Sequence, residues 1–345
     1  MASVAPTPRD VVLRDGSAAL YRFRRPTAPP AADAKGPAAP GVLRAAATLP
    51  VLVVPSMINR WYVVDLRAGA SLVAALLAGG LDVFCLDWGT AQDEDRYLAW
   101  DDVLARLARA VRFVERIAGA PRVGLLGYCM GATLAGIHAA LEPGHVAALV
   151  NLAGPFDFAH GGLLRTMVDA AWFDARAVAE AGNVAPLQMQ GGFVAMRPTM
   201  QMAKWLAWLD RAHDPKAREA FDALEEWAGD NIPFPGAAYA TYIEELYQKN
   251  ALVRGEHHVA GRRVDLARIQ CPVLTVAAER DTICPLPAAR ALNEACGSAD
   301  KELMVVPGGH VGAVVGSRAP QVLYPAMRDW LSSRLSTTTA RDACN

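Results

Sequence analysis

One stretch decides the fold of this chain: Val123-Gly124-Leu125-Leu126-Gly127-Tyr128-Cys129-Met130-Gly131-Ala132. Its apolar run predicts a buried strand, and residues 133–140 predict a helix. A strand that passes into a helix through Gly-Tyr-Cys-Met-Gly has the layout of a nucleophile elbow, which places one reactive side chain at the tip of a parallel sheet. Glycines are expected on both sides of that residue, because the strained turn leaves no room for side chains. We therefore predict that Cys129 is a nucleophile; the alternative is an inert, buried cysteine at a tight turn.

The rest of the chain alternates between short apolar runs and helical patterns. Besides the elbow strand, strands are predicted at residues 50–55, 82–87, 146–152, 271–278 and 302–306, with one or two edge strands within 10–25. Besides the helix after Cys129, helices are predicted at residues 66–79 and 101–117. Continuous apolar strands separated by helices are typical of a doubly wound, mostly parallel sheet. The predicted fold class is therefore α/β.

The alternation stops between residues 155 and 260. This segment carries tryptophans and methionines mostly at helical spacing: Trp172, Trp205, Trp208, Trp227, Met167, Met189, Met196, Met200 and Met202. Such a stripe is more often core than binding surface, but an insertion after the sixth strand also lies where a mainly helical cap can cover a site. The expected organisation is edge strands and a Pro/Ala-rich connector at 1–47, a core at 48–154 and 261–337, and a cap at 155–260.

Composition excludes several classes of function. The 345 residues are 53% hydrophobic, enough for a large core, and 34 Lys and Arg balance 35 Asp and Glu, which gives no support for a nucleic-acid binder. No apolar run reaches the ~18 residues of a membrane span, and the N-terminus lacks the pattern of a secretory signal. The six cysteines are widely spaced, which favours reduced thiols in the cytoplasm over a zinc site or a disulfide framework.

A cysteine nucleophile needs a base, and the base needs a carboxylate to orient it. Among seven histidines, His310 follows a predicted strand in the glycine-rich loop 307–312, and Asp281 likewise follows the strand ending at residue 278. The order nucleophile, acid, histidine is that of α/β-hydrolases. The remaining histidines are better explained as surface or locally hydrogen-bonded residues: His138, His145, His160, His213, His257 and His258.

Backbone amides must also stabilise the oxyanion that forms during acyl transfer. The residue after the nucleophile supplies one, here Met130, and the loop after the third strand supplies the other, for which Ile58 is the candidate. That loop continues into Asn59, Arg60 and Tyr62, which are candidate contacts for a substrate. Arg67 and Arg96 are further candidates for an anionic group of the substrate, although lone arginines are usually solvated surface charges.

Five stretches together resemble one family. They are Pro-Ser-Met-Ile-Asn-Arg-Trp-Tyr-Val-Val-Asp-Leu from Pro55, Leu-Asp-Trp-Gly from Leu86, Gly-Tyr-Cys-Met-Gly from Gly127, Gly-Arg-Arg-Val-Asp-Leu from Gly261 and Gly-Gly-His-Val-Gly from Gly308. In this order, over about residues 51–335, they resemble the catalytic subunit of class III polyhydroxyalkanoate synthases. The chain departs from the family box at Ala132, where a second glycine is usual.

The resemblance implies an α/β-hydrolase core with a cap and a triad of Cys129, His310 and Asp281. It implies polymerisation of (R)-3-hydroxyacyl-CoA through a cysteine thioester, with CoA released at each step and no cofactor beyond the CoA of the substrate. The phosphates of that CoA are then the anionic groups for which Asn59, Arg60, Tyr62, Arg67 and Arg96 are candidates. It further implies a growing polyester chain as a partner, a separate non-catalytic subunit, a homodimer or hetero-oligomer, and a place at the surface of cytoplasmic polyester granules.

Two other classes of function remain open from the sequence. A thiol hydrolase on the same scaffold, such as a polyester depolymerase or an acyl-CoA thioesterase, would differ only in the second chemical step. A non-catalytic relative that binds a granule or a partner is the third class, and the complete triad argues against it.

Overall fold

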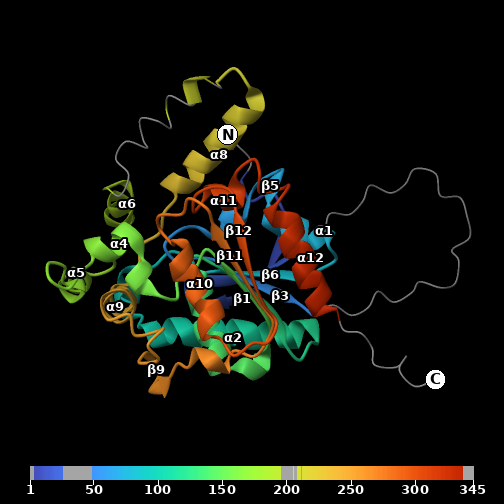
Figure 1. Ribbon diagram of the computed structural model, residues 1–345. Coiled ribbons are helices and arrows are strands. Elements are labelled where there is room, and N and C mark those ends of the chain that lie inside the picture. Colours follow the sequence, from blue (N-terminus) through green and yellow to red (C-terminus); the bar gives the residue numbers. More distant parts are fainter. Residues whose placement is uncertain (1–3, 26–48, 196–204, 206–207, 211, 337–345) are drawn as a thin grey trace, which may run out of the picture.

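The computed structural model describes residues 4–25, 49–195, 205, 208–210 and 212–336, so the predicted connector lies largely outside the described residues. One eight-stranded sheet forms its centre (Figure 1). Its strands are β1 Arg9–Asp15, β2 Ala18–Phe23, β3 Val51–Val54, β6 Val83–Asp87, β7 Val123–Tyr128, β8 Val146–Leu152, β11 Val273–Ala278 and β12 Lys301–Val306. They lie in the order β1-β2-β6-β3-β7-β8-β11-β12. In this order, neighbouring strands from β6 to β12 pair in parallel, and β2 pairs antiparallel with both of its neighbours, β1 and β6. The predicted, mostly parallel sheet is thereby confirmed.

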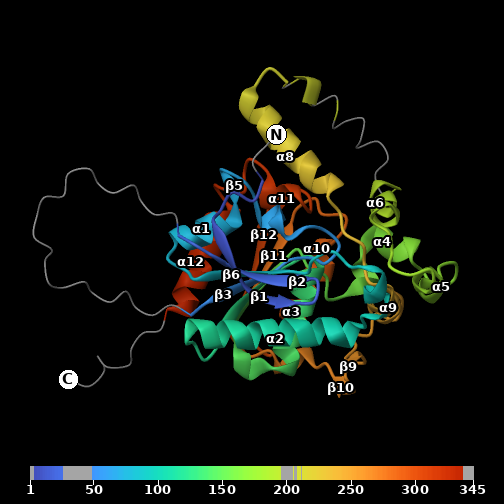
Figure 2. The same ribbon diagram turned by 180° about the vertical axis from the view of Figure 1, so that it is seen from behind.

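Helices cover both faces of the sheet (Figures 1 and 2). One face packs against α2 Trp100–Ala118, α3 Met130–Leu141 and α10 Leu286–Ala295. The other packs against α1 Leu72–Ala78, α11 Gly312–Val315 and α12 Leu323–Leu335. Because β7, β11 and β12 are parallel, the loops that leave their carboxyl ends meet at one edge of the sheet, where open α/β sheets place their sites.

The helix predicted at residues 66–79 is wrong over its first half. Residues Asp65–Arg67 and Ala70–Ser71 form two short antiparallel strands, β4 and β5. Gly69, at a φ of +76°, turns the chain between them, a conformation that glycine adopts without strain. Helix α1 begins only after Ser71, whose hydroxyl accepts a hydrogen bond from the amide of Ala74.

A mainly helical segment follows β8, the sixth strand of the sheet along the chain. It contains η4 Phe158–His160, α4 Gly162–Met167, α5 Ala175–Glu180, α6 Pro186–Ala195, α8 Pro215–Gly229, α9 Gly236–Thr241 and the π-helix η5 Tyr242–Gln248. Figure 2 shows α4, α5, α6 and α9 together at one end of the sheet. The hairpin of β9 His258–Val259 and β10 Arg262–Arg263 straddles the expected boundary at residue 260, so the division into core and cap stays a prediction.

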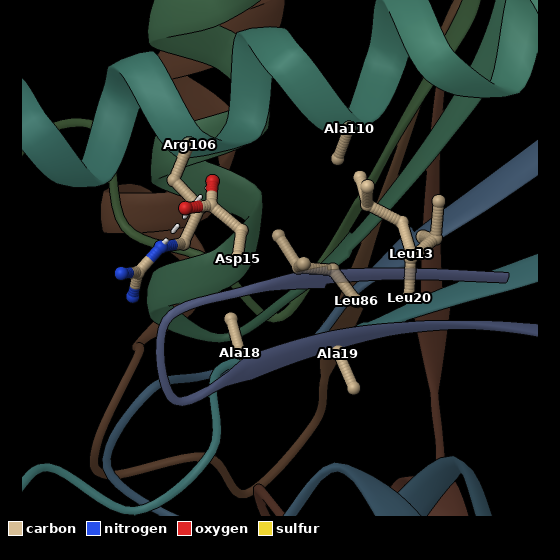
Figure 3. A pocket seen from close by; sticks show the side chains of 8 residues that line it. All are labelled: Leu13, Asp15, Ala18, Ala19, Leu20, Leu86, Arg106 and Ala110. Carbon is tan, nitrogen blue, oxygen red and sulfur yellow. Dashed lines mark ion pairs between the residues drawn. The ribbon is translucent and has the colours of Figure 1, made fainter. Parts of the chain in front are cut away.

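The remaining short helices are η1 Trp61–Val64, η2 Asp93–Tyr97, η3 Pro143–His145 and η6 Leu266–Arg268. A small void lies between the β1–β2 hairpin and α2, beside the ion pair of Asp15 with Arg106 (Figure 3). Its volume of about 10 Å³ holds one water molecule at most, so it is no substrate site. Among the described residues, no helix is both long and apolar enough to cross a bilayer.

Candidate active site

The elbow at Cys129 has the strained geometry that its glycines predict. Cys129 lies between β7 and α3 with a φ of +56°, a value that residues with side chains seldom adopt. A Cβ on Gly127 would come within 2.2 Å of the Cα of Ala132, and one on Gly131 within 2.0 Å of the carbonyl oxygen of Val54. Neither glycine can therefore carry a side chain while the turn keeps this shape. The turn holds Cys129 at the N-cap of α3, at the carboxyl end of β7.

A buried histidine–aspartate pair lies beside this turn. Nδ1 of His310 is 2.7 Å from Oδ2 of Asp281, and both side chains are buried. The other carboxylate oxygen, Oδ1, accepts hydrogen bonds from the amides of Ile283 and Cys284, each at 2.8 Å. Asp281 is thus held in one orientation by its own loop and in turn orients the imidazole, as a carboxylate does for a catalytic base.

The electrostatics of His310 tie it to Cys129. Burial lowers the pKa of His310, but the charge of a Cys129 thiolate and the bonds to Asp281 and Cys129 outweigh burial and raise the pKa to about 10. Within the described residues Nε2 of His310 has no hydrogen-bond partner of standard geometry, although Cys129 is near enough to act on the ring. Bonds in a site without substrate are often long and tighten only when substrate binds. The charge of Cys129 and the carboxylate of Asp281 together favour the protonated form of His310.

Aromatic side chains surround the pair. The ring of Tyr128 stacks on the imidazole of His310, with centroids 5.5 Å apart and planes 29° from parallel. From the π-helix η5, Tyr242 and Tyr247 approach Cys129. Burial raises the pKa of both hydroxyls, and the charge of a Cys129 thiolate raises these pKa values further. π-helices are rare and occur frequently at functional sites, and this one places two tyrosines where the charge of the nucleophile acts on them.

The predicted oxyanion residues lie at the elbow and in the facing loop. Met130 is the first residue of α3, and the first amides of a helix have no acceptor within it. The amide of Ile58 already donates to Oγ of Ser56 at 3.2 Å, so this weak bond would have to break for Ile58 to donate to an oxyanion. The indole of Trp88 donates to the carbonyl oxygen of Pro55 at 2.9 Å and so fixes the start of the loop. Ile58 therefore stays a prediction.

The residues predicted to contact substrate, Asn59, Arg60 and Tyr62, form hydrogen bonds with the segment that follows α8. The side chain of Asn59 donates to that of Asn231, and their backbones form a β-bridge. Nε of Arg60 lies 3.0 Å from Oδ1 of Asp230, and the hydroxyl of Tyr62 lies 2.9 Å from Oδ2 of the same carboxylate. We call the contacts of these five residues the cap latch. These contacts do not test whether Asn59, Arg60 and Tyr62 bind substrate, so that role stays a prediction.

The two other candidate arginines make local contacts. Arg67 donates to the carbonyl oxygen of Ala68, and Arg96 donates to that of Asp93. These bonds provide no contact with the triad, so a role for either arginine in binding CoA remains a prediction.

The tryptophans and methionines of residues 155–260 differ in burial: Trp227 is 6% exposed and Met189 packs against the core. Trp172 is 66% exposed and Trp205 is 49% exposed. The buried aromatic cluster near Cys129 is instead built from tyrosine and phenylalanine, with the rings of Phe158 and Tyr247 4.8 Å apart. Met196, Met200 and Met202 lie outside the described residues.

Comparison with known proteins agrees with this geometry. A profile of the alpha/beta hydrolase fold family matches residues 50–317. The poly(3-hydroxyalkanoate) polymerase subunit PhaC of Allochromatium vinosum is 31% identical over 331 residues, which cover 95% of this chain and 89% of the relative. The chain belongs to the poly(3-hydroxyalkanoate) polymerase family. The resemblance and the fold predicted from the sequence are thereby confirmed.

Other matches agree on family and fold. The polymerase subunit PhaC of Haloferax mediterranei is 32% identical over 341 residues, which cover 98% of this chain but 66% of that longer relative. Among solved structures, a putative lipase from Sulfolobus solfataricus superimposes with a TM-score of 0.57 at 15% identity, covering 94% of this chain and 93% of that one. At that identity the lipase supports the fold alone.

Where the polymerase family usually has a second glycine, this chain has Ala132, and Gly154, which follows β8, makes room for its side chain. The Cβ of Ala132 packs where a Cβ on Gly154 would come within 2.4 Å, so Gly154 leaves the space that Ala132 occupies. No sequence pattern singled out Gly154, Tyr128, Tyr242 or Tyr247 as part of the site. The only available signal was the spacing of the last two, which are five residues apart as in a π-helix rather than three or four.

Proposed function

We propose that this protein polymerises (R)-3-hydroxyacyl-CoA into a polyester and releases CoA at each addition. The observation that carries the proposal is the buried Asp281–His310 pair beside a cysteine on a nucleophile elbow, in a chain of the polymerase family. A thioester is a suitable substrate for a thiolate, because one thioester replaces another and the CoA thiolate is a good leaving group.

In the first step Cys129 attacks the carbonyl carbon of the acyl-CoA thioester. His310 takes the proton of the thiol, and Asp281 stabilises the imidazolium that results. The negative oxygen of the tetrahedral intermediate is stabilised by the amide of Met130 at the start of α3, together with an amide from the loop of Ile58. The bond to the sulfur of CoA then breaks, and the imidazolium returns its proton to the leaving thiolate.

In the second step a hydroxyl group must attack the acyl-enzyme instead of water. The hydroxyl comes from another 3-hydroxyacyl group or from the end of the growing chain. His310 takes its proton, an ester forms, and Cys129 is regenerated as the thiol. The buried rings of Tyr242 and Tyr247, on whose hydroxyls the charge of Cys129 acts, pack with Phe158 into an aromatic cluster that disfavours water.

The proposal includes a site of action and a partner. A polymerase that keeps its product attached would act at the surface of polyester granules. Several relatives are called polymerase subunits, and on this ground we include a second, non-catalytic subunit as a partner of this chain. CoA enters only as part of the substrate.

The test is incubation of the purified protein with (R)-3-hydroxybutyryl-CoA, with and without a candidate partner subunit. Turbid polymer that forms in step with CoA release supports the proposal. Release of CoA together with free 3-hydroxybutyrate, and without polymer, would make the protein a thiol hydrolase. No release under either condition would contradict both.

A further inference from the structure

Tyr128 is the residue just before the nucleophile, and its contacts differ from those of an ordinary strand residue. It ends β7, is 3% exposed, and belongs to the core formed with α11 and α12. Within the described residues its hydroxyl oxygen has no hydrogen-bond partner. A buried hydroxyl without a partner destabilises a protein, so packing alone does not explain this tyrosine. Its ring, by contrast, makes a specific contact.

That contact is with the face of His310. The ring centroids are 5.5 Å apart and the ring planes 29° from parallel, so the phenol lies over the imidazole rather than against its edge. The edge of the imidazole is occupied separately, with Asp281 on Nδ1. The face of an aromatic ring attracts a cation within about 6 Å, and the attraction strengthens when both groups are removed from water. His310 is 8% exposed and meets this condition.

We propose that Tyr128 is a positioning residue: its ring holds the plane of the His310 imidazole and stabilises the imidazolium that forms when Cys129 loses its proton. The ring acts through stacking, and the hydroxyl is dispensable. The proposal rests on the proposed function only in that His310 serves as the base. The role proposed for Tyr128 does not depend on which substrate the enzyme binds.

Other groups also act on His310 and must be kept constant in any test. Asp281 approaches from the loop after β11, and Cys129 from the start of α3. From the segment after β8, Tyr247 acts on both Cys129 and Asp281. Cys129 and Asp281 favour the imidazolium by charge and by hydrogen bonding, whereas Tyr128 adds the only aromatic face stacked on the ring among the described contacts. Substitution of Tyr128 leaves the charges in place.

The experiment is a pH titration of His310 by NMR in protein labelled at the histidine Cε1, with the resonance assigned from His310→Gln. Tyr128→Leu removes the ring and is expected to lower the pKa of His310 by ~0.5 to ~1.5 units, because the cation loses an attractive face. Tyr128→Phe keeps the ring, removes the hydroxyl, and is expected to titrate within ~0.3 units of the wild type. The upper pH limit of kcat/KM for CoA release should move with the titration.

Two outcomes overturn the proposal. Tyr128→Leu could leave the titration of His310 unchanged, which would give the ring no electrostatic role. Tyr128→Phe could lower the pKa as much as Tyr128→Leu, which would assign the effect to the hydroxyl. If Tyr128→Leu does not fold, Tyr128→Met is measured by the same criteria. A wild type that titrates as expected but makes no polymer would contradict the proposed function and leave this inference standing.

Discussion

Nδ1 of His310 lies 2.7 Å from Oδ2 of Asp281 although the two residues are 29 positions apart in the chain. They follow adjacent parallel strands, β11 and β12, whose last paired residues are Ala278 and Val306. The sheet register therefore brings the two loops together before any side chain contributes. In addition, the amide of Arg280 donates to the carbonyl oxygen of Gly308 at 2.8 Å, which joins the loops directly.

This relationship predicts the effect of Asp281→Asn. The amide keeps the size of the carboxylate but removes its charge, so the imidazolium loses its partner and the pKa of His310 falls. We expect kcat for CoA release to fall by ~10²–10⁴-fold while the fold is retained. Asp300→Asn, which alters only a surface ion pair with Arg334, is the matched control and should retain activity. An active Asp281→Asn enzyme would remove Asp281 from the triad.

The raised pKa of His310 also predicts a dependence of stability on pH. In the folded protein its pKa is about 10, above the ordinary value of 6.5, so folding favours the protonated ring. The stability that this group contributes is fully present below pH 6.5 and is lost as the pH rises through about 10. The difference in free energy of unfolding between the wild type and His310→Gln should therefore shrink from pH 6 to pH 10. Urea unfolding at several pH values measures it, and a constant difference would contradict the assignment.

Breaking the cap latch is expected to lower the stability of the protein and, at the same time, to admit water to the acyl-enzyme. Asp230 accepts from both Arg60 and Tyr62, and its side chain is only partly exposed. Asp230→Ala should lower the free energy of unfolding by about 1–2 kcal/mol, and it should raise the share of acyl-enzyme lost as free acid, because the segment next to the oxyanion loop is less constrained. Asp222→Ala, an exposed change on α8, is the control. Equal product ratios in the two variants would show that the latch does not exclude water.

The packing of Ala132 against Gly154 predicts a coupled pair of substitutions. Gly154→Ala would place two Cβ atoms 2.4 Å apart and should cost about 2–3 kcal/mol of stability. Adding Ala132→Gly should recover part of this loss, although that change alone costs ~1 kcal/mol in a helix. Recovery stays incomplete because the new Cβ is also 2.7 Å from the carbonyl oxygen of Cys129. Thermal unfolding of the two single variants and the double variant tests this, and strictly additive losses would contradict the contact.

The sequence was sufficient to predict the sheet and the pairing of Asp281 with His310. Each central strand is buried on both faces, so it appears as an uninterrupted apolar run such as residues 146–152, which coincides with β8. The loops of Asp281 and His310 follow such runs directly, and parallel pairing then determines where they meet.

What the sequence could not predict depends on contacts between distant or irregular segments. Asp230 is 170 residues from Arg60, and no local pattern marks that pair. Tyr242 and Tyr247 approach Cys129 from a π-helix, whose spacing differs from the helical period used for prediction. The β4–β5 ladder was mistaken for helix because strands of three and two residues are too short to show alternation.

The most direct test of the central claim is the mass of the enzyme during turnover. Wild-type protein is mixed with (R)-3-hydroxybutyryl-CoA, quenched in acid within the first turnovers, and analysed intact and as peptides, with Cys271→Ser as a control thiol variant. The account predicts 3-hydroxybutyryl groups on the peptide that contains Cys129, retained in Cys271→Ser and lost, together with CoA release, in Cys129→Ala. Release of CoA by Cys129→Ala at the wild-type rate, or an acyl group on another residue, would contradict it.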